Sequence, residues 1–405
     1  MNLTLEQGQF YDKNGYLVVK GAFTDEELKR LDRGVYGAVT SGNCSSCGKV
    51  YPAPETLYIV EGQYQDDPDL LLIGEHPAVT GPVESLLDGY ACLSAFVSYL
   101  KTPGAVGTSG DYQGSHPTGH CDYKTYQQAG SSLNWLFAII PLTDLDEETG
   151  SLLVSPGSHR ESKIVSVTDK VSEVHRAQAH DIAPLIDAEL KRGDLCFMHG
   201  FTWHEGKGNS SNHDRYGIYL KYRAVNAPPG CGPQLFRERA FSVFSEAGKR
   251  FVPHHGGRSF VEAQLIVDHG GNFLLVEGDA RDWKLPGAAP LEKLVKESVT
   301  ADIIGQLDTS LQKKYGLEIP WMTYIADYRN GDGVRRVYAY QDSGGATAAR
   351  TPGPEFRWCD GEEIRAFADN GKLESEDADA IHRWETENCV RGVGESMERA
   401  KKFAQ

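Results

Sequence analysis

The sequence predicts a mainly β fold, a barrel or jelly roll with flanking helices, followed by an α+β domain. Short apolar runs separated by Gly, Pro, Asn and Asp extend from residue 99 to residue 224, which is typical of closely spaced strands. Loop-like stretches at 226–233 and 253–257 then break this pattern, and both strand and helix patterns follow. The length of 405 residues is enough for two or three domains.

We place the first domain at residues 1–230, a linker at 231–254 and the second domain at 255–405. Near the start, residues 15–20 read as a short strand, and Thr24 with Glu27 forms a capping box that begins a helix. This helix is expected to reach about Val39. The later strands of the first domain are expected near Trp135, Gly150, Asp194 and Tyr216.

The second domain begins with an expected strand pair, 259–268 and 272–276, joined by a His-Gly-Gly turn. A helix is expected from about Leu291 to Lys314, a strand at 337–340, and a charged helix near 377–387. This alternation of element types indicates an α+β domain. The sequence contains no internal repeat of the first domain in the second.

Composition and charge exclude several classes of protein. Lys and Arg number 41 against 57 Asp and Glu, which gives a net charge of −16, the wrong sign for a protein that tracks phosphates. The start of the chain lacks the basic and apolar segments of a signal peptide, and no apolar run approaches the roughly 20 residues that span a bilayer. We therefore expect a cytoplasmic protein that acts on a small molecule, without nucleic acid or membrane partners.

The eight cysteines are scattered along the chain and favour reduced thiols over a disulfide framework. Cys44 and Cys47 form a single C-x-x-C motif. A zinc ribbon needs a second such pair, which the sequence lacks. A reduced loop is the favoured interpretation, with a metal or redox role as the alternative.

The residues with the most chemical content are His120 and Asp122, followed much later by His204 and Arg215. Two imidazoles and one carboxylate are the facial triad of non-heme iron(II) oxygenases, and side chains two apart on an extended segment point to the same face. An H-x-D pair alone is common by chance. Arg215 strengthens the metal hypothesis because a guanidinium inside a barrel needs an anionic partner, such as a dicarboxylate co-substrate.

At this point residues 5–225 resemble the phytanoyl-CoA dioxygenase family of iron(II)- and 2-oxoglutarate-dependent oxygenases. The resemblance rests on five segments. They are Phe10 with Gly15-Tyr-Leu-Val-Val and Thr24-Asp-Glu-Glu-Leu, His120-Cys-Asp122, Leu142-Thr-Asp, Gly150-Ser-Leu-Leu-Val-Ser-Pro-Gly-Ser-His, and Gly193-Asp-Leu-Cys-Phe-Met-His-Gly-Phe-Thr-Trp-His204 with Arg215.

The resemblance implies a double-stranded β-helix of the jelly-roll or cupin-like type. It implies iron(II) held by His120, Asp122 and His204, and 2-oxoglutarate bound to the iron with its far carboxylate on Arg215. Oxygen is the second co-substrate, and succinate and carbon dioxide are released while a C–H bond is hydroxylated or otherwise oxidised. Related halogenases have a small residue at the carboxylate position, so Asp122 disfavours halogenation.

Other polar residues near these motifs allow two interpretations. Thr202 and Asn209 either orient a bound ligand or cap a turn, and Thr202 is our additional candidate for binding the co-substrate. His199 and His159 are expected to be structural. If the strand after Arg215 alternates strictly, a set of three residues shares its face and meets an anionic substrate or solvent. This set is Tyr219, Lys221 and Arg223.

The second domain resembles a Nudix fold over residues 255–385. The matching segments are Ala263-Gln-Leu-Ile-Val-Asp, Asn272-Phe-Leu-Leu-Val, Trp283-Lys-Leu-Pro-Gly, Glu297-Ser, Lys313-Lys-Tyr-Gly-Leu317 and Glu355-Phe-Arg-Trp-Cys-Asp-Gly-Glu-Glu-Ile. Nudix hydrolases place metal-binding glutamates where this chain has Lys313 and Lys314, and an Arg-Glu pair where it has Thr309 and Ser310. Ammonium groups do not bind hard cations, so a degenerate domain for binding or assembly, including homo-oligomer formation, is expected.

Two other functions were weighed against the dioxygenase. In one, the Nudix-like domain captures a nucleotide or CoA-type ligand and the barrel is vestigial, but a vestigial site has no reason to keep four matched groups. In the other, the protein is a Nudix hydrolase with an accessory barrel, which the two lysines oppose. The substrate itself cannot be read from the sequence.

Overall fold

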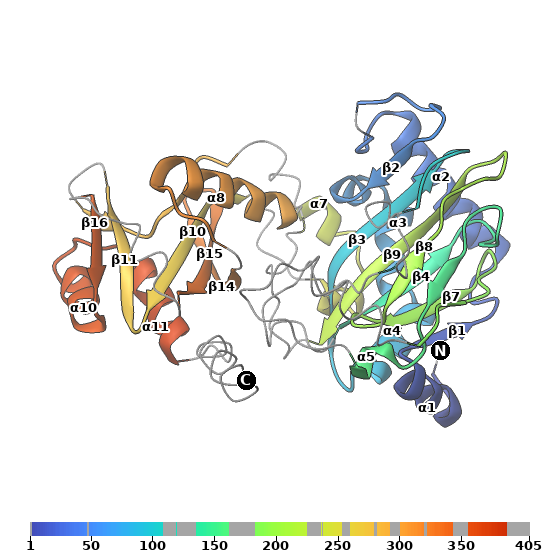
Figure 1. The fold of residues 1–405 in the computed structure, drawn as a ribbon, viewed down its shortest axis with the longest axis horizontal. Helices are drawn as coiled ribbons and strands as arrows, with labels where there is room; N and C mark the ends of the chain where they lie inside the picture. The colour runs from blue at the N-terminus through green and yellow to red at the C-terminus, as the bar shows by residue number, and fades with distance from the viewer. Residues whose placement is uncertain are drawn as a thin grey trace.

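The computed structural model contains two units, one at each end of the long axis in Figure 1. The first carries the N-terminus and the second the C-terminal helices. The structure describes residues 2–46, 48–107, 119, 135–161, 183–224, 236, 238–252, 260–278, 282–291, 300–319, 322–342 and 355–386. All structural statements below refer to these residues.

The first unit is built on two antiparallel sheets. The larger has six strands in the order β1-β7-β4-β9-β3-β2, and the smaller has three in the order β6-β5-β8. The strands are β1 Tyr16–Val19, β2 Leu57–Val60, β3 Ala91–Lys101, β4 Trp135–Pro141, β5 Leu152–Val154, β6 Ile186–Asp187, β7 Leu195–His199, β8 His204–Gly206 and β9 Arg215–Ala224. From β4 to β9 the chain passes back and forth between the sheets, which is the jelly-roll pattern. The predicted mainly β class is therefore confirmed.

Helices cover the outer face of the six-stranded sheet (Figure 1). They are α1 Leu5–Asn14, α2 Asp25–Thr40, α3 Pro68–Leu72 and α4 Pro77–Leu86, with 3₁₀ turns η1 Gly62–Asp66 and η2 Ile73–Glu75. A further short helix, α5 Ser158–Glu161, follows β5. The predicted capping box at the start of α2 is confirmed, because Thr24 Oγ1 accepts from Glu27 N and the Glu27 carboxylate accepts from Thr24 N. The predicted end of this helix, Val39, is one residue short.

Side chains alternate along the strands of the large sheet, so those on its two faces enter two different cores. On β9, Ile218 and Leu220 point outward into the cluster shared with α2 and α4. On β4, Phe137 and Ile139 point inward into a second cluster between the two sheets. The inward face of β9 is different, because it carries polar and charged residues into this interior, beginning with Arg215.

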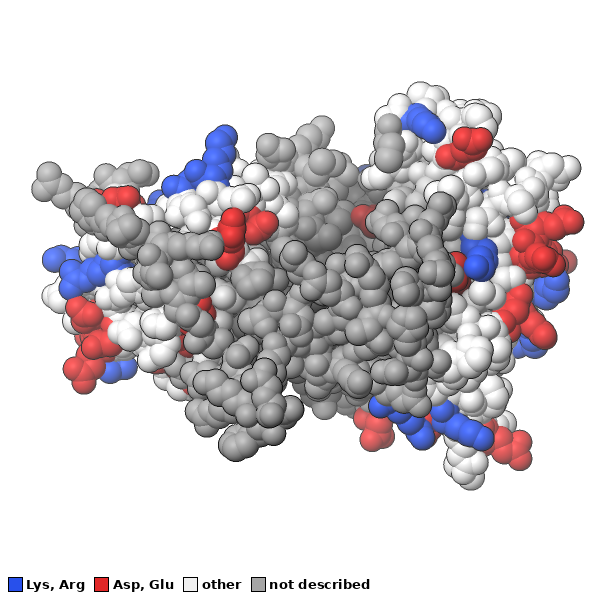
Figure 2. Space-filling view, viewed as in Figure 1, with Lys and Arg blue, Asp and Glu red and all other residues white. Residues whose placement is uncertain are grey.

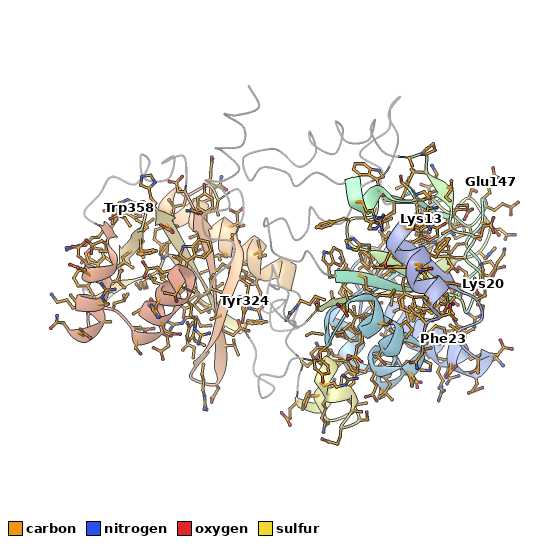
Figure 3. All side chains as sticks on the ribbon, turned by 90° about the horizontal axis from the view of Figure 1, so that it is seen from below. Lys13, Lys20, Phe23, Glu147, Tyr324 and Trp358 are labelled. Carbon is orange, nitrogen blue, oxygen red and sulfur yellow. The ribbon has the colours of Figure 1, made fainter. Side chains whose placement is uncertain are left out.

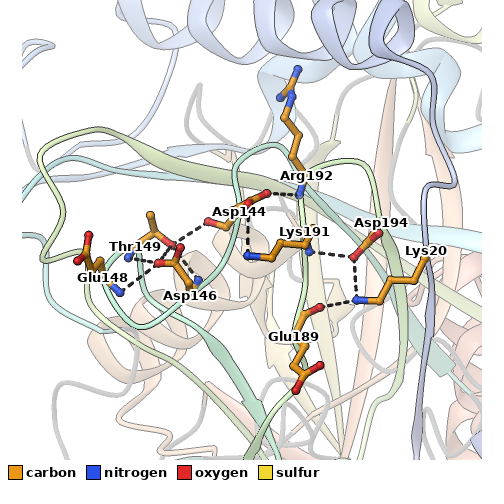
Figure 4. Close-up of polar contacts among 9 residues, drawn as sticks. All are labelled: Lys20, Asp144, Asp146, Glu148, Thr149, Glu189, Lys191, Arg192 and Asp194. Atoms are coloured by element: carbon orange, nitrogen blue, oxygen red, sulfur yellow. Dashed lines mark hydrogen bonds and ion pairs between the residues drawn. The ribbon is translucent and has the colours of Figure 1, made fainter.

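A polar network fixes the loops that precede β5 and β7 (Figure 4). Asp194 accepts from the main chain of Lys191 at 2.9 Å and Gly21 at 3.0 Å, and from Lys20 Nζ at 3.1 Å. Asp146 similarly accepts from the backbone of Thr149 at 2.9 Å. Because β5 and β7 lead away from these loops toward His204 and His199, the network closes the opposite end of the barrel.

Part of the segment 231–254, which we expect to be a linker, packs on the first unit where the structure describes it. Phe236, Phe244 and Phe251 are buried in the outer core of the first unit, and two short segments lie between them, α7 Glu238–Phe241 and η5 Gly248–Phe251. A tether between domains would leave such aromatic residues in water. Their burial of apolar area anchors this segment to the first unit instead.

The second unit is an α+β fold with a seven-stranded mixed sheet. Its central strands β10 and β15 are parallel, and the other pairs are antiparallel. The elements are β10 Phe260–His269, β11 Asn272–Glu277, β12 Trp283–Lys284, β13 Gly287–Ala288, α8 Thr300–Tyr315, β14 Thr323–Asn330, β15 Gly333–Gln341, β16 Phe356–Cys359, α10 Gly361–Asp369 and α11 Ser375–Thr386.

The helices of this unit bury apolar stripes against the sheet. Ile303, Leu307 and Leu311 of α8 are fully buried and recur every four residues, as expected of one helix face. The predicted strand pair and C-terminal helix are confirmed. The expected start of the long helix at Leu291 is wrong, because Leu291 lies outside any helix and its N–H donates to Val261 O.

Charged side chains of both signs lie on the surface of the described residues. On the face in Figure 2, acidic and basic side chains of the described residues are interspersed over both units, without a continuous basic tract. None of the helices in the described part of the chain combines the length and the apolar character needed to cross a bilayer.

Candidate active site

His204 begins β8, on the small sheet, and its side chain points into the barrel with 9% of its surface exposed. Its Nδ1 lies 3.0 Å from Thr202 O. A carbonyl only accepts, so Nδ1 carries the proton and Nε2 carries the lone pair of the neutral ring. The ring also packs edge to face on Phe137, with centroids 6.3 Å apart. This orientation fits the predicted role of a metal ligand.

The loop before His204 is attached to the N-terminal segment through Gly15. The carbonyl of Gly15 accepts from Thr202 Oγ1 at 2.7 Å and from His199 N at 2.8 Å. Gly15 has a φ of 78°, and a Cβ there would lie 2.4 Å from the His159 ring, so glycine is required. The hydroxyl proton of Thr202 is therefore committed to structure. Direct contact of Thr202 with a co-substrate stays a prediction.

Arg215 begins β9 on the large sheet and is 2% exposed. Its Nη1 donates to Tyr219 Oη at 3.1 Å. Its Nε and Nη2 are buried without a hydrogen-bond partner, and none of the carboxylates that the structure describes forms an ion pair with it. A buried guanidinium with two unused donors is costly. The arrangement therefore fits a bound carboxylate.

Lys101 is a buried cation that the sequence analysis did not identify. It ends β3 directly opposite Arg215 in the antiparallel register, and its side chain is fully buried. Its Nζ donates to Lys207 O at 2.9 Å. Burial, and secondly the charge of Arg215, lower its pKa to about 7. In the sequence it is simply the last residue of an apolar run, and only the strand register brings it to Arg215.

The predicted alternation along β9 is confirmed. Tyr219, Lys221 and Arg223 are partly exposed while the residues between them are buried. Lys221 Nζ lies over the rings of Phe137 and Trp135, 4.9 Å and 5.6 Å from their centroids, where cation–π attraction holds it. Whether this stripe meets an anionic substrate stays a prediction.

His120 and Asp122 lie outside the described residues, so their positions are not stated. Among the residues that are described, no group of three or more His, Cys, Asp or Glu side chains could hold a metal ion. The only predicted metal ligand within the described ranges is His204.

The remaining candidates have structural contacts. Asn209 Nδ2 donates to Lys101 O at 3.0 Å and to His213 O at 2.7 Å, which staples the loop between β8 and β9. Burial lowers the pKa of His199 to about 4, and its Nδ1 accepts from Phe201 N, in agreement with a structural role.

His159 Nε2 bonds to the main-chain carbonyl of Asp12 at 3.1 Å, which also agrees with the structural role expected for it. Cys44 is a half-buried free thiol whose pKa is raised by burial. Its predicted partner in the C-x-x-C motif, Cys47, is outside the described residues.

A family model matches this chain. The model for phytanoyl-CoA dioxygenase (PhyH) covers residues 11–217, just over half of the 405 residues. The chain belongs to the phytanoyl-CoA dioxygenase family. The enzyme class expected from the resemblance is thereby confirmed: the protein is a 2-oxoglutarate-dependent non-heme iron dioxygenase, with iron(II) as cofactor and 2-oxoglutarate and oxygen as co-substrates.

Characterised relatives are distant. A probable phytanoyl-CoA dioxygenase of Caenorhabditis elegans is 23% identical over 248 residues, which are 54% of this chain and 75% of that protein. The peroxisomal phytanoyl-CoA dioxygenase of Mus musculus is 24% identical over 53% of this chain and 67% of its own length.

Solved structures are similarly distant. The non-heme alpha-ketoglutarate-dependent carbocyclase SnoK of nogalamycin biosynthesis has a TM-score of 0.47 at 21% identity, over 56% of this chain and 86% of its own. EctD of S. alaskensis with bound Fe has a TM-score of 0.46 at 18% identity, over 56% and 78%.

Proposed function

We propose that the barrel holds iron(II) through His120, Asp122 and His204, and that Arg215 binds the far carboxylate of 2-oxoglutarate. The observation that supports this most is Arg215. Its two unused donors lie in the barrel interior, and a planar guanidinium pairs with a carboxylate through two parallel hydrogen bonds. A binding protein with a vestigial barrel would have no reason to keep this costly group buried.

The protein's own residues then have separate tasks. Bound iron(II) and 2-oxoglutarate would together supply the activation of oxygen. His204 offers Nε2 while Thr202 O fixes its tautomer and ring plane. Arg215, held by Tyr219, sets the position of the co-substrate. The apolar interior formed by Phe137, Ile139 and their neighbours excludes water from the reacting centre.

The reaction we propose is hydroxylation, or another oxidation, of an unactivated C–H bond in a small-molecule substrate, with release of succinate and carbon dioxide. The mouth of the barrel carries Lys221 and Arg223 on β9. These cations favour a substrate with an anionic group near the oxidised carbon.

We also propose that the second unit is a degenerate Nudix-like domain that shapes access to the barrel or forms a dimer contact. A mixed sheet with a long helix whose last turn carries Lys313 and Lys314 supports the resemblance. Tyr324 lies on the side of this unit nearer the barrel in Figure 3, with Trp358 on the far side. The charge of Arg223 at the end of β9 also acts to lower the pKa of Tyr324, against a larger upward effect of burial.

Anaerobic reconstitution tests the metal site. The wild-type protein should bind one iron(II) and develop a visible charge-transfer band with 2-oxoglutarate. His120→Ala, Asp122→Ala and His204→Ala should each abolish the band, because two remaining ligands hold a labile divalent ion poorly. His213→Ala, at an exposed histidine of the same barrel, is the matched control and should keep it. A full band in any of the three ligand variants would refute the assignment.

The substrate class is tested by measuring succinate release with candidate small molecules that differ only in charge. Anionic compounds should couple succinate release to their own oxidation more efficiently than neutral analogues. Equal coupling across the series would remove the role proposed for Lys221 and Arg223.

A further inference from the structure

Two cations lie side by side inside the barrel, and none of the carboxylates in the described ranges forms an ion pair with either of them. Lys101 and Arg215 face each other across β3 and β9, and they are 0% and 2% exposed. Like charges directly opposite on neighbouring strands destabilise a sheet. This cost needs a compensating partner or a functional reason.

The groups around Lys101 do not supply that compensation. From β9 it faces Arg215, and from the loop after β8 it meets the carbonyl of Lys207, which accepts a hydrogen bond from its Nζ at 2.9 Å. From β8 the charge of Glu205 acts on it, but Glu205 Oε1 pairs with Lys207 Nζ at 3.0 Å. Asn209 bonds only to the main chain of Lys101. Among the described residues, an ammonium group with three donors therefore uses one.

We propose that Lys101 is a second anchor for the distal carboxylate of 2-oxoglutarate, so that two buried cations hold the co-substrate rather than Arg215 alone. This inference rests on the proposed role of Arg215. Both side chains are buried on the same face of neighbouring strands, the charge of Arg215 acts on Lys101, and Arg215 has two unused donors. A carboxylate has about four acceptor positions, which is enough for a bidentate guanidinium and an ammonium group together.

The arrangement has a consequence for protons. Burial and the neighbouring Arg215 bring the pKa of Lys101 to about 7 in the free protein, so above that pH the amine is largely neutral. A bound carboxylate favours the charged form. Binding of 2-oxoglutarate should therefore take up a proton above pH 7 and lose this uptake at pH 6.

The test compares Lys101→Met, Lys101→Gln and the wild-type protein, loaded with manganese(II) under anaerobic conditions. Glutamine keeps a donor for Lys207 O but removes the charge, so it separates the hydrogen bond from the anchor. Lys191→Met is the control, because Lys191 is exposed and paired with Asp144. Calorimetry with 2-oxoglutarate in two buffers of different ionisation enthalpy gives both Kd and proton uptake. Thermal unfolding of the metal-free protein is the second measurement.

Both Lys101 variants should raise the Kd of 2-oxoglutarate about 10- to 100-fold, the effect of one charge-assisted hydrogen bond, and abolish proton uptake at pH 8. Lys101→Met should also raise the unfolding temperature of the metal-free protein, since it removes an uncompensated buried cation. The control should change neither quantity.

An unchanged Kd in both Lys101 variants would overturn the inference. If the unfolding temperature also fell, the lysine would be purely structural. If Lys101→Met does not fold, Lys101→Gln alone decides. Absence of 2-oxoglutarate binding by the wild-type protein would refute the proposed function itself. Binding that depends on Arg215 but not on Lys101 would refute only this inference.

Discussion

Replacement of Arg215 by leucine removes the group on which the proposed co-substrate site depends. Leucine fills part of the same space and leaves neither charge nor donor. Because Arg215 supports none of the described main-chain carbonyls and bonds only to Tyr219 Oη, the fold should survive. The three residues proposed to bind iron are untouched, so the variant should still bind metal.

The size of the effect follows from the two unpartnered donors. Losing one member of a buried, hydrogen-bonded charge pair costs about 2–5 kcal/mol. At about 1.4 kcal/mol for each factor of ten, the Kd of 2-oxoglutarate should rise roughly 30- to several-thousand-fold. Tyr219→Phe removes the hydroxyl that accepts from Arg215 Nη1 but keeps the guanidinium, and should raise the Kd less than about tenfold.

The assay is an anaerobic titration of the iron(II) protein with 2-oxoglutarate, followed by its charge-transfer band, with iron content measured in parallel. Retained iron with a greatly weakened band is the expected result. A wild-type affinity in Arg215→Leu would show that another residue holds the far carboxylate. A larger loss in Tyr219→Phe than in Arg215→Leu would also contradict the reasoning.

Three further predictions concern other parts of the chain. Thr202→Val should lower the free energy of unfolding by about 1 kcal/mol and weaken iron binding, because the loop that carries His204 is held less firmly. Thr202→Ser should change neither quantity. Thermal unfolding measures the first effect and metal titration the second. Burial raises the pKa of Asp377 from its ordinary 3.8 to about 6. The free energy of unfolding of the wild-type protein should therefore fall by at most about 3 kcal/mol as the pH rises from 4 to 6. Denaturant unfolding of Asp377→Asn should show a free energy that depends less on pH over this range. If the second unit is the degenerate Nudix-like domain proposed, with Lys313 and Lys314 in place of metal-binding carboxylates, the intact protein should release no phosphate or nucleoside monophosphate from nucleoside diphosphate derivatives with magnesium. Magnesium-dependent release would overturn that interpretation.

The sequence alone predicts the elements that are stabilised by contacts between residues close together in the chain. Thr24 and Glu27 satisfy each other's main chain within four residues, so the start of α2 is visible without any tertiary knowledge. The alternation of β9 is equally local, and it correctly placed Tyr219 and Lys221 on the face of Arg215. The family motif includes both His204 and Arg215. In the structure each of them begins one of two consecutive strands.

Features that depend on long-range packing were not predictable in this way. Pro- and Gly-rich residues around 226–233 suggested a linker, and nothing local indicates that Phe236 and Phe244 would be buried against helices of the first unit. Lys101 is the clearest case at the site. Its neighbour Arg215 is more than a hundred residues away along the chain, and only the β3–β9 register makes the two side chains adjacent.

The loop between β8 and β9 connects the strand that begins at His204 to the strand that begins at Arg215. The side chain of Asn209 donates to Lys101 O at the end of β3 and to His213 O near the end of the same loop. Its main chain adds two bonds, to Gly104 N and Ala105 O, each 2.8 Å long. The loop is thereby part of the closed end of the barrel rather than a flexible connection. The same amide therefore holds in place the two strands that carry the paired cations, which gives a glycine- and serine-rich loop the precision that a co-substrate site requires.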